Sequence, residues 1–90
     1  MEIEFDAAKN QANIIKHGIG LHLAEDFEWD SAIIHPDERK NYGESRFIAL
    51  GFISSRLHVV IFTTRNKNLR IISLRKANER ERKEYEKETL

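Results

Sequence analysis

The sequence has no cysteine, no net charge at pH 7 and no long apolar run. Without cysteine the chain forms neither a disulfide framework nor a thiolate metal site. No apolar stretch approaches the roughly 20 residues of a membrane span, and the acidic start, MEIEFD, does not follow the signal-peptide pattern. We therefore expect a protein of the reducing cytoplasm that makes no contact with a membrane.

The chain also lacks the common motifs of metal and cofactor chemistry. No Walker-type phosphate loop, paired-carboxylate motif or nucleophile elbow is present. The four histidines are scattered without the spacing of metal ligands. They are His17, His22, His35 and His58. We expect neither a metal ion nor an organic cofactor.

The zero net charge conceals an uneven distribution of charged residues. Residues 45–78 contain seven basic side chains and no acidic one, so this stretch carries +7 and the rest of the chain −7. The seven are Arg46, Arg56, Arg65, Lys67, Arg70, Arg75 and Lys76. Such a basic stretch favours a polyanionic ligand, with RNA as the first candidate. The alternative is that these side chains guard exposed strand edges, or pair with the ten acidic residues of positions 1–44.

The first third of the chain has the pattern of two helices. Asp6 is a suitable N-cap for a helix over residues 7–17, and Gly18 is a suitable end. A second helix is predicted over about residues 21–29. The apolar face of the first helix consists of Ala8, Ala12 and Ile15, and the inward-facing side chains of the second are Leu21, Ala24 and Phe27.

From residue 31 the pattern changes to that of strands. Strands are predicted at residues 32–35, 46–53, 57–64 and 69–74, and their short connections indicate an antiparallel meander. Residues 3–5 form either a short strand or a packed arm. A charged helix from about residue 77 is poorly able to bury itself. The expectation is one α+β domain over residues 1–90, with two N-terminal helices, a four-stranded antiparallel sheet and a C-terminal helix.

Arginines on the two last predicted strands are the strongest candidates for chemistry. The planar guanidinium binds phosphate with two hydrogen bonds and stays charged at any working pH. Side chains alternate along a regular strand, so Arg70 and Arg75 would point to opposite faces unless the strand ends or bulges at Leu74. His17, beside Lys16 at the end of a helix, is a candidate acid or base, or simply a partner of the helix dipole.

Five segments along the chain combine arginine, glycine and polar positions in a fixed order. They are FDxxKNxxNxxKHG (residues 5–18), YGExR (42–46), VVIFTxR (59–65), RIISxRxA (70–77) and ERxxY (81–85), with Gly51 between the second and the third. In order and spacing they resemble the BrnT family, toxins of bacterial type II toxin–antitoxin systems with a RelE-like ribonuclease fold. The chain departs from the family at Phe5, where tryptophan is usual, and at Leu74 and Lys76, where alanine and arginine are usual.

The resemblance implies endoribonuclease activity that needs no metal. The ribose 2′-hydroxyl would attack the neighbouring phosphate and leave a 2′,3′-cyclic phosphate. Arg65, Arg70 and Arg75 would bind the scissile phosphate and neutralise its developing charge, and Arg46 would support them from the adjacent strand. His17 is one candidate for proton transfer.

The resemblance also implies further RNA contacts and a protein partner. Lys16, Lys67 and Lys76 would contact the RNA, and Lys16 is the other candidate for proton transfer. The expected substrate is mRNA, whose cleavage inhibits translation. The expected partner is a BrnA-like antitoxin with a ribbon-helix-helix half, and operator DNA would be bound only through the complex.

Two other functions remain open from the sequence. The zero net charge favours a non-catalytic module that complexes a DNA-binding partner, because free RNA-binding proteins tend to be basic overall. A protein that binds DNA directly ranks last, since no helix carries clustered base-reading residues.

Overall fold

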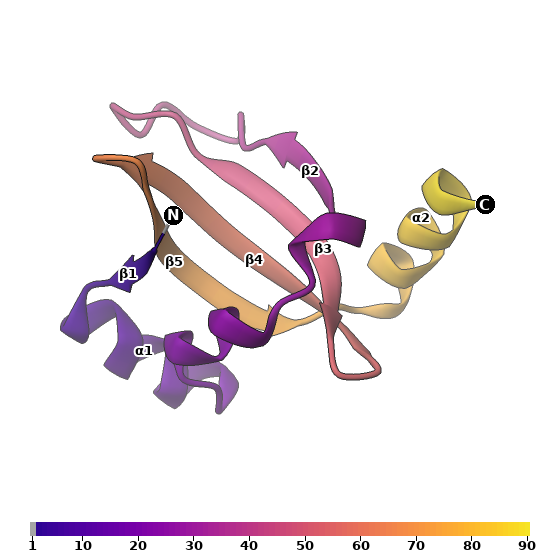
Figure 1. Ribbon diagram of the computed structural model, residues 1–90, viewed down its shortest axis with the longest axis horizontal. Helices are drawn as coiled ribbons and strands as arrows, with labels where there is room; N and C mark the ends of the chain where they lie inside the picture. The colour runs from indigo at the N-terminus through magenta and orange to yellow at the C-terminus, as the bar shows by residue number, and fades with distance from the viewer. Residues whose placement is uncertain (1) are drawn as a thin grey trace.

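The computed structural model describes residues 2–90, which form one sheet with helical elements on both faces (Figure 1). The elements follow in the order β1 (Ile3–Phe5), α1 (Ala7–His17), the 3-10 segments η1 (Leu21–Asp26) and η2 (Trp29–Ser31), β2 (Ile33–Pro36), β3 (Phe47–Ile53), β4 (Arg56–Arg65), β5 (Asn68–Lys76) and α2 (Glu79–Thr89). The α+β class agrees with the expectation. Within the described residues no helix is long and apolar enough to cross a membrane.

The sheet has five strands in the order β1-β5-β4-β3-β2, not the four expected. β2 to β5 form the predicted antiparallel meander. β1 adds to the outer side of β5 and runs parallel to it, with Ile3 opposite Leu69 and Phe5 opposite Ile71. The prediction of a four-stranded antiparallel sheet is therefore wrong. Three residues are too few to show the alternation that distinguishes a strand from a packed arm. The partner of β1, strand β5, also lies near the other end of the sequence.

The larger core lies on the face of the sheet covered by η1 and η2. Leu21, Ala24 and Phe27 face inward as expected and are almost fully buried. They come from a 3-10 segment and its end, whereas an α-helix was predicted over residues 21–29, so that part of the fold prediction is wrong. Their spacing of three suits a 3-10 helix, in which every third side chain lies in line.

α1 lies against the edge of β5 and docks through an asparagine. Asn13 Nδ2 donates to the carbonyl oxygens of Ile19 and Leu74, both at 2.8 Å, and Asn13 Oδ1 accepts from the Leu74 N–H at 3.2 Å. The apolar side of the helix points to solvent instead, with Ile15 78% exposed. The free edge of a strand presents unpaired backbone groups, and these need a polar partner.

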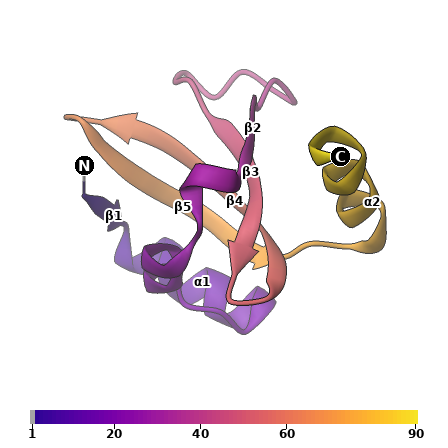
Figure 2. The same cartoon turned by 45° about the vertical axis from the view of Figure 1, so that its right-hand side comes forward.

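α2 covers one end of the opposite face, as Figure 2 shows. Tyr85 is its one buried side chain and packs with Leu50, Leu57 and Val59. The Tyr85 hydroxyl donates to the Ser31 carbonyl oxygen at 2.9 Å. The remaining side chains of α2 are mostly charged and exposed, so the helix covers little of the sheet beyond Tyr85.

Candidate active site

A β-bulge in β5 brings Arg70 and Arg75 to the same face of the sheet. Thr63 of β4 lies opposite Arg70, Ile61 opposite Ser73 and Val59 opposite Arg75, and the register shifts between Ile61 and Phe62. One extra residue in β5, Ile72, accounts for the shift, since two residues of the bulged strand then oppose one of its neighbour. Cross-strand partners share a face. The sequence allowed for a bulge at Leu74. The structure has a bulge two residues earlier, at Ile72.

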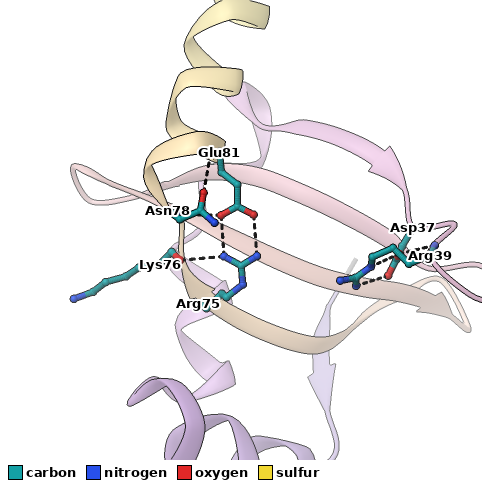
Figure 3. Close-up of polar contacts among 6 residues, drawn as sticks. All are labelled: Asp37, Arg39, Arg75, Lys76, Asn78 and Glu81. Carbon is teal, nitrogen blue, oxygen red and sulfur yellow. Dashed lines mark hydrogen bonds and ion pairs between the residues drawn. The ribbon is translucent and has the colours of Figure 1, made fainter.

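We call the surface that carries Arg70, Ser73 and Arg75 the basic face. It is the same side of the sheet as α2 and opposite to η1, because Val59 and Tyr85 pack together on it. Arg39 reaches over it from the loop between β2 and β3, and its guanidinium points in the direction of Arg75 (Figure 3).

Arg75 is held by the first turn of α2. Its Nη1 and Nη2 donate to Oε1 and Oε2 of Glu81, both at 2.8 Å, and Nη1 also lies 3.3 Å from the Lys76 carbonyl oxygen. Glu81 Oε1 accepts from the Asn78 N–H at 2.9 Å as part of a capping box, so the same carboxylate begins the helix and orients the arginine (Figure 3). The hydrogen bond to Glu81 raises the pKa of Arg75, and that from Arg75 lowers the pKa of Glu81.

Arg39 is a further basic residue of this face that the sequence analysis did not single out. Its Nε and Nη2 donate to Oδ1 and Oδ2 of Asp37 at 2.7 and 2.8 Å. The Asp37 side chain is fully buried, and the hydrogen bond from Arg39 lowers its pKa to about 2. The positive charge of Arg39 opposes the rise in the pKa of Arg75, but the hydrogen bond to Glu81 outweighs it and the pKa of Arg75 is raised on balance. The only signal in the sequence was an acid two residues before an arginine in a polar loop.

Arg46 lies just before β3, where the chain crosses the basic face. Thr63, on this face, donates its hydroxyl to the Ser45 carbonyl oxygen at 2.6 Å. The Arg46 guanidinium carbon lies 4.1 Å from the centre of the Tyr42 ring, and its Nε donates to Glu44 Oε2 at 2.9 Å. Stacking and pairing together fix the direction of the side chain.

The remaining predicted basic residues are distributed around the sheet. Arg70 makes a loose ion pair with Glu4, with 3.9 Å between Nη1 and Oε2. Arg65 is the last residue of β4, and the alternation of side chains along the strand places it on the basic face. It is exposed and has no ion pair within residues 2–90. Lys67 lies in the turn that follows. Lys76 lies opposite His58, on the other face from Arg75, and is not brought to the site.

His17 and Lys16 lie at the C-terminal end of α1, beside the edge of β5. Burial lowers the pKa of His17, and the positive charges of Lys16 and Arg75 lower it further. His17 is therefore mainly neutral at pH 7, and it lines the edge of β5 together with Ser73, two residues before Arg75. Within residues 2–90 no three acidic or histidine side chains group as a metal site would require.

A family model described as "Ribonuclease toxin, BrnT, of type II toxin-antitoxin system" matches residues 5–81. The chain belongs to this family. The resemblance seen in the sequence is confirmed, and the matched range includes all the basic residues of the site described above. No curated protein matches the chain significantly. BrnT proteins are ribonuclease toxins, so membership implies an RNA substrate and an antitoxin partner.

The basic face of this BrnT chain can bind an anion with several fixed guanidinium groups. The exposed fractions of their side chains are 61% for Arg39, 33% for Arg75, 23% for Arg70 and 21% for Arg46. Arg39, Arg46 and Arg75 are each oriented by hydrogen bonds to a carboxylate, Arg70 has only a loose ion pair, and all four side chains are partly exposed. Guanidinium groups fixed in advance stabilise a developing negative charge without further reorganisation.

Proposed function

We propose that this BrnT toxin cleaves mRNA on the basic face without a metal ion and so inhibits translation. The observation that carries the proposal is the bulge at Ile72, which gives Arg70 and Arg75 one face in common beside Arg39. Without it the two arginines would face opposite sides of the sheet, and only one of them would reach a given phosphate.

In the proposed reaction the substrate supplies its own nucleophile. The ribose 2′-oxygen forms a bond to the adjacent phosphorus, and the bond from phosphorus to the 5′-oxygen of the next nucleotide breaks. Arg70 and Arg75 bind the phosphate oxygens, with Arg46 and Arg65 beside them on the same face. Neutral His17 accepts the proton of the 2′-hydroxyl, and the leaving 5′-oxygen takes a proton from solvent.

Purified protein tests the reaction type directly. We expect cleavage of RNA in excess EDTA, with products that end in a 2′,3′-cyclic phosphate and a 5′-hydroxyl, and no cleavage of an RNA with a 2′-deoxyribose at the cut site. Products with a 5′-phosphate, or full dependence on added metal, would contradict the proposed mechanism.

His17 predicts the pH dependence of cleavage. Its pKa lies below the ordinary 6.5, so the imidazole is neutral at pH 7 and becomes protonated only in more acidic solution. The cleavage rate should fall as the pH drops through that pKa, because imidazolium cannot accept a proton. In His17→Ala we expect the cleavage rate to be about 100-fold lower. The fall of the rate in acidic solution should also be absent from its pH profile. A single-turnover pH profile that is identical in both proteins would remove His17 from the reaction.

The antitoxin is proposed to be a BrnA-like protein with a ribbon-helix-helix half, through which the complex binds operator DNA. Family membership supports the existence of an antitoxin partner. Co-expression with the cognate antitoxin should restore growth, and the purified complex should bind operator DNA whereas the toxin alone should not.

A second candidate function is a non-catalytic module that complexes the same partner. It is favoured by the carboxylate partners of the basic face, since Arg39, Arg46 and Arg75 each have a close ion pair within the chain. Paired arginines also occur for purely structural reasons. A folded chain that binds antitoxin and cuts no RNA would establish this alternative.

A further inference from the structure

A small cavity lies where α1 meets the bulge of β5. It measures about 210 Å³, and its polar lining includes Lys9, Lys16, His17 and Ser73. The cavity arises because β1 pairs with β5 only as far as Ile71, so the edge of β5 next to the bulge has no neighbouring strand. No acidic residue lines it.

The charged groups of this cavity are free for a ligand. Within residues 2–90 neither Lys9 nor Lys16 has an ion pair, and the Ser73 hydroxyl has no hydrogen-bond partner. Asp6 is the acid that lies near Lys9, and its side chain accepts the Lys9 backbone N–H at 2.9 Å as the N-cap of α1. Asn13 also lines the cavity, but both N–H groups of its amide donate to backbone carbonyls and its oxygen accepts the Leu74 N–H.

The cavity is continuous with the basic face through Ser73. This residue lies between Arg70 and Arg75 in the cross-strand register, and it also lines the cavity. The positive charge of Arg75 also lowers the pKa of His17, which lines the cavity with Ser73. An RNA strand whose scissile phosphate lies on Arg70 and Arg75 therefore has a basic path around the edge of β5.

We propose that this cavity binds a second backbone phosphate of the RNA, the one next to the scissile phosphate, through Lys9 and Lys16. The inference rests on the proposed function, because it takes the position of the scissile phosphate from it. A second fixed phosphate holds the intervening ribose, whose 2′-hydroxyl must line up with the bond that breaks. The chemistry recognised is the phosphodiester charge and not the base.

Binding of an uncleavable RNA tests the proposal. The probe is an oligonucleotide with one mapped cut site and a 2′-deoxyribose at the attacking position. Lys9→Ala/Lys16→Ala should bind it about tenfold more weakly, with the slope of log affinity against log salt reduced by about 0.7. The matched control is Lys83→Ala/Lys87→Ala, which removes two exposed lysines from α2 and should bind within about twofold of the wild type. Equal binding by the two double variants would overturn the proposal.

A neutral phosphate identifies the position. A methylphosphonate replaces each phosphate beside the scissile one in turn. At one of these two positions the methylphosphonate should weaken binding to the wild type by the same factor as the two lysine substitutions do. The same methylphosphonate should not weaken binding to Lys9→Ala/Lys16→Ala any further. Losses that simply add at both positions would refute the subsite. If the wild type cleaves RNA while either result fails, the subsite alone is wrong; if the wild type cuts no RNA, the proposed function fails and the subsite with it.

Discussion

Arg75→Ala should reduce the single-turnover rate of RNA cleavage by about 100- to 1,000-fold, and with it the growth arrest. The direction of the Arg75 side chain is fixed, because both terminal nitrogens donate to Glu81 at 2.8 Å. Its charge would oppose the charge that builds up on the phosphate as the 2′-oxygen attacks. Arg75→Lys keeps the charge but loses the planar fork, so an intermediate loss is expected.

The control for Arg75 must separate its role in catalysis from its role in holding α2. Glu81→Gln removes the ion pair, keeps the guanidinium, and retains a residue that serves the capping box with Asn78. We expect its rate to stay within about tenfold of the wild type, with a modest loss of thermal stability. A folded Arg75→Ala protein that cleaves at the wild-type rate would exclude Arg75 from the reaction. If Glu81→Gln loses as much as Arg75→Ala, the ion pair would be the essential feature.

Asn13→Ala should have the largest effect on stability. It removes three hydrogen bonds and leaves buried backbone groups of Ile19 and Leu74 without partners. The expected loss is about 2–4 kcal/mol in the free energy of unfolding, or a fall of about 10 °C or more in Tm. Thermal unfolding followed by circular dichroism measures it.

Gln11→Ala provides the matched comparison on the same helix. Gln11 is exposed and makes no side-chain hydrogen bond within residues 2–90, so its Tm should stay within about 2 °C of the wild type. A similarly small change in Asn13→Ala would contradict the role assigned to the asparagine. Because Asn13 fixes α1 to β5, its loss should also displace His17 and lower the cleavage rate at temperatures where the sheet is still folded.

Local patterns predicted much of this fold correctly. The alternation of apolar residues placed β2 to β5 within one or two residues, and Asp6 and Gly18 mark the start and end of α1 as expected. The sequence did not decide whether residues 3–5 form a strand or a packed arm, because the parallel partner of β1 is distant in sequence. The docking of α1 was not predictable from hydrophobicity, since the edge of β5 requires hydrogen-bond partners and Asn13 supplies them.

The site was predictable in composition and not in arrangement. Arginine in the acid-free stretch pointed to the basic face, but two successive isoleucines, Ile71 and Ile72, give no sign that one of them is the extra residue of a bulge. That bulge decides whether Arg70 and Arg75 act together. Arg39 escaped notice because it lies in a loop outside the acid-free stretch, and its direction depends on the buried Asp37.

The most direct test of the account is to map new RNA ends after controlled expression of the chain. The variants to compare are Arg75→Ala and, as a control, Arg56→Ala. Arg56 is an exposed arginine at the start of β4 with no ion pair within residues 2–90, and it lies opposite Ile53, which packs on the other face of the sheet. We expect growth arrest and new 5′-hydroxyl ends for the wild type and Arg56→Ala, and neither for folded Arg75→Ala. A folded wild-type chain that produces no new ends would contradict the ribonuclease site, and new ends that persist in Arg75→Ala would place the chemistry away from the basic face.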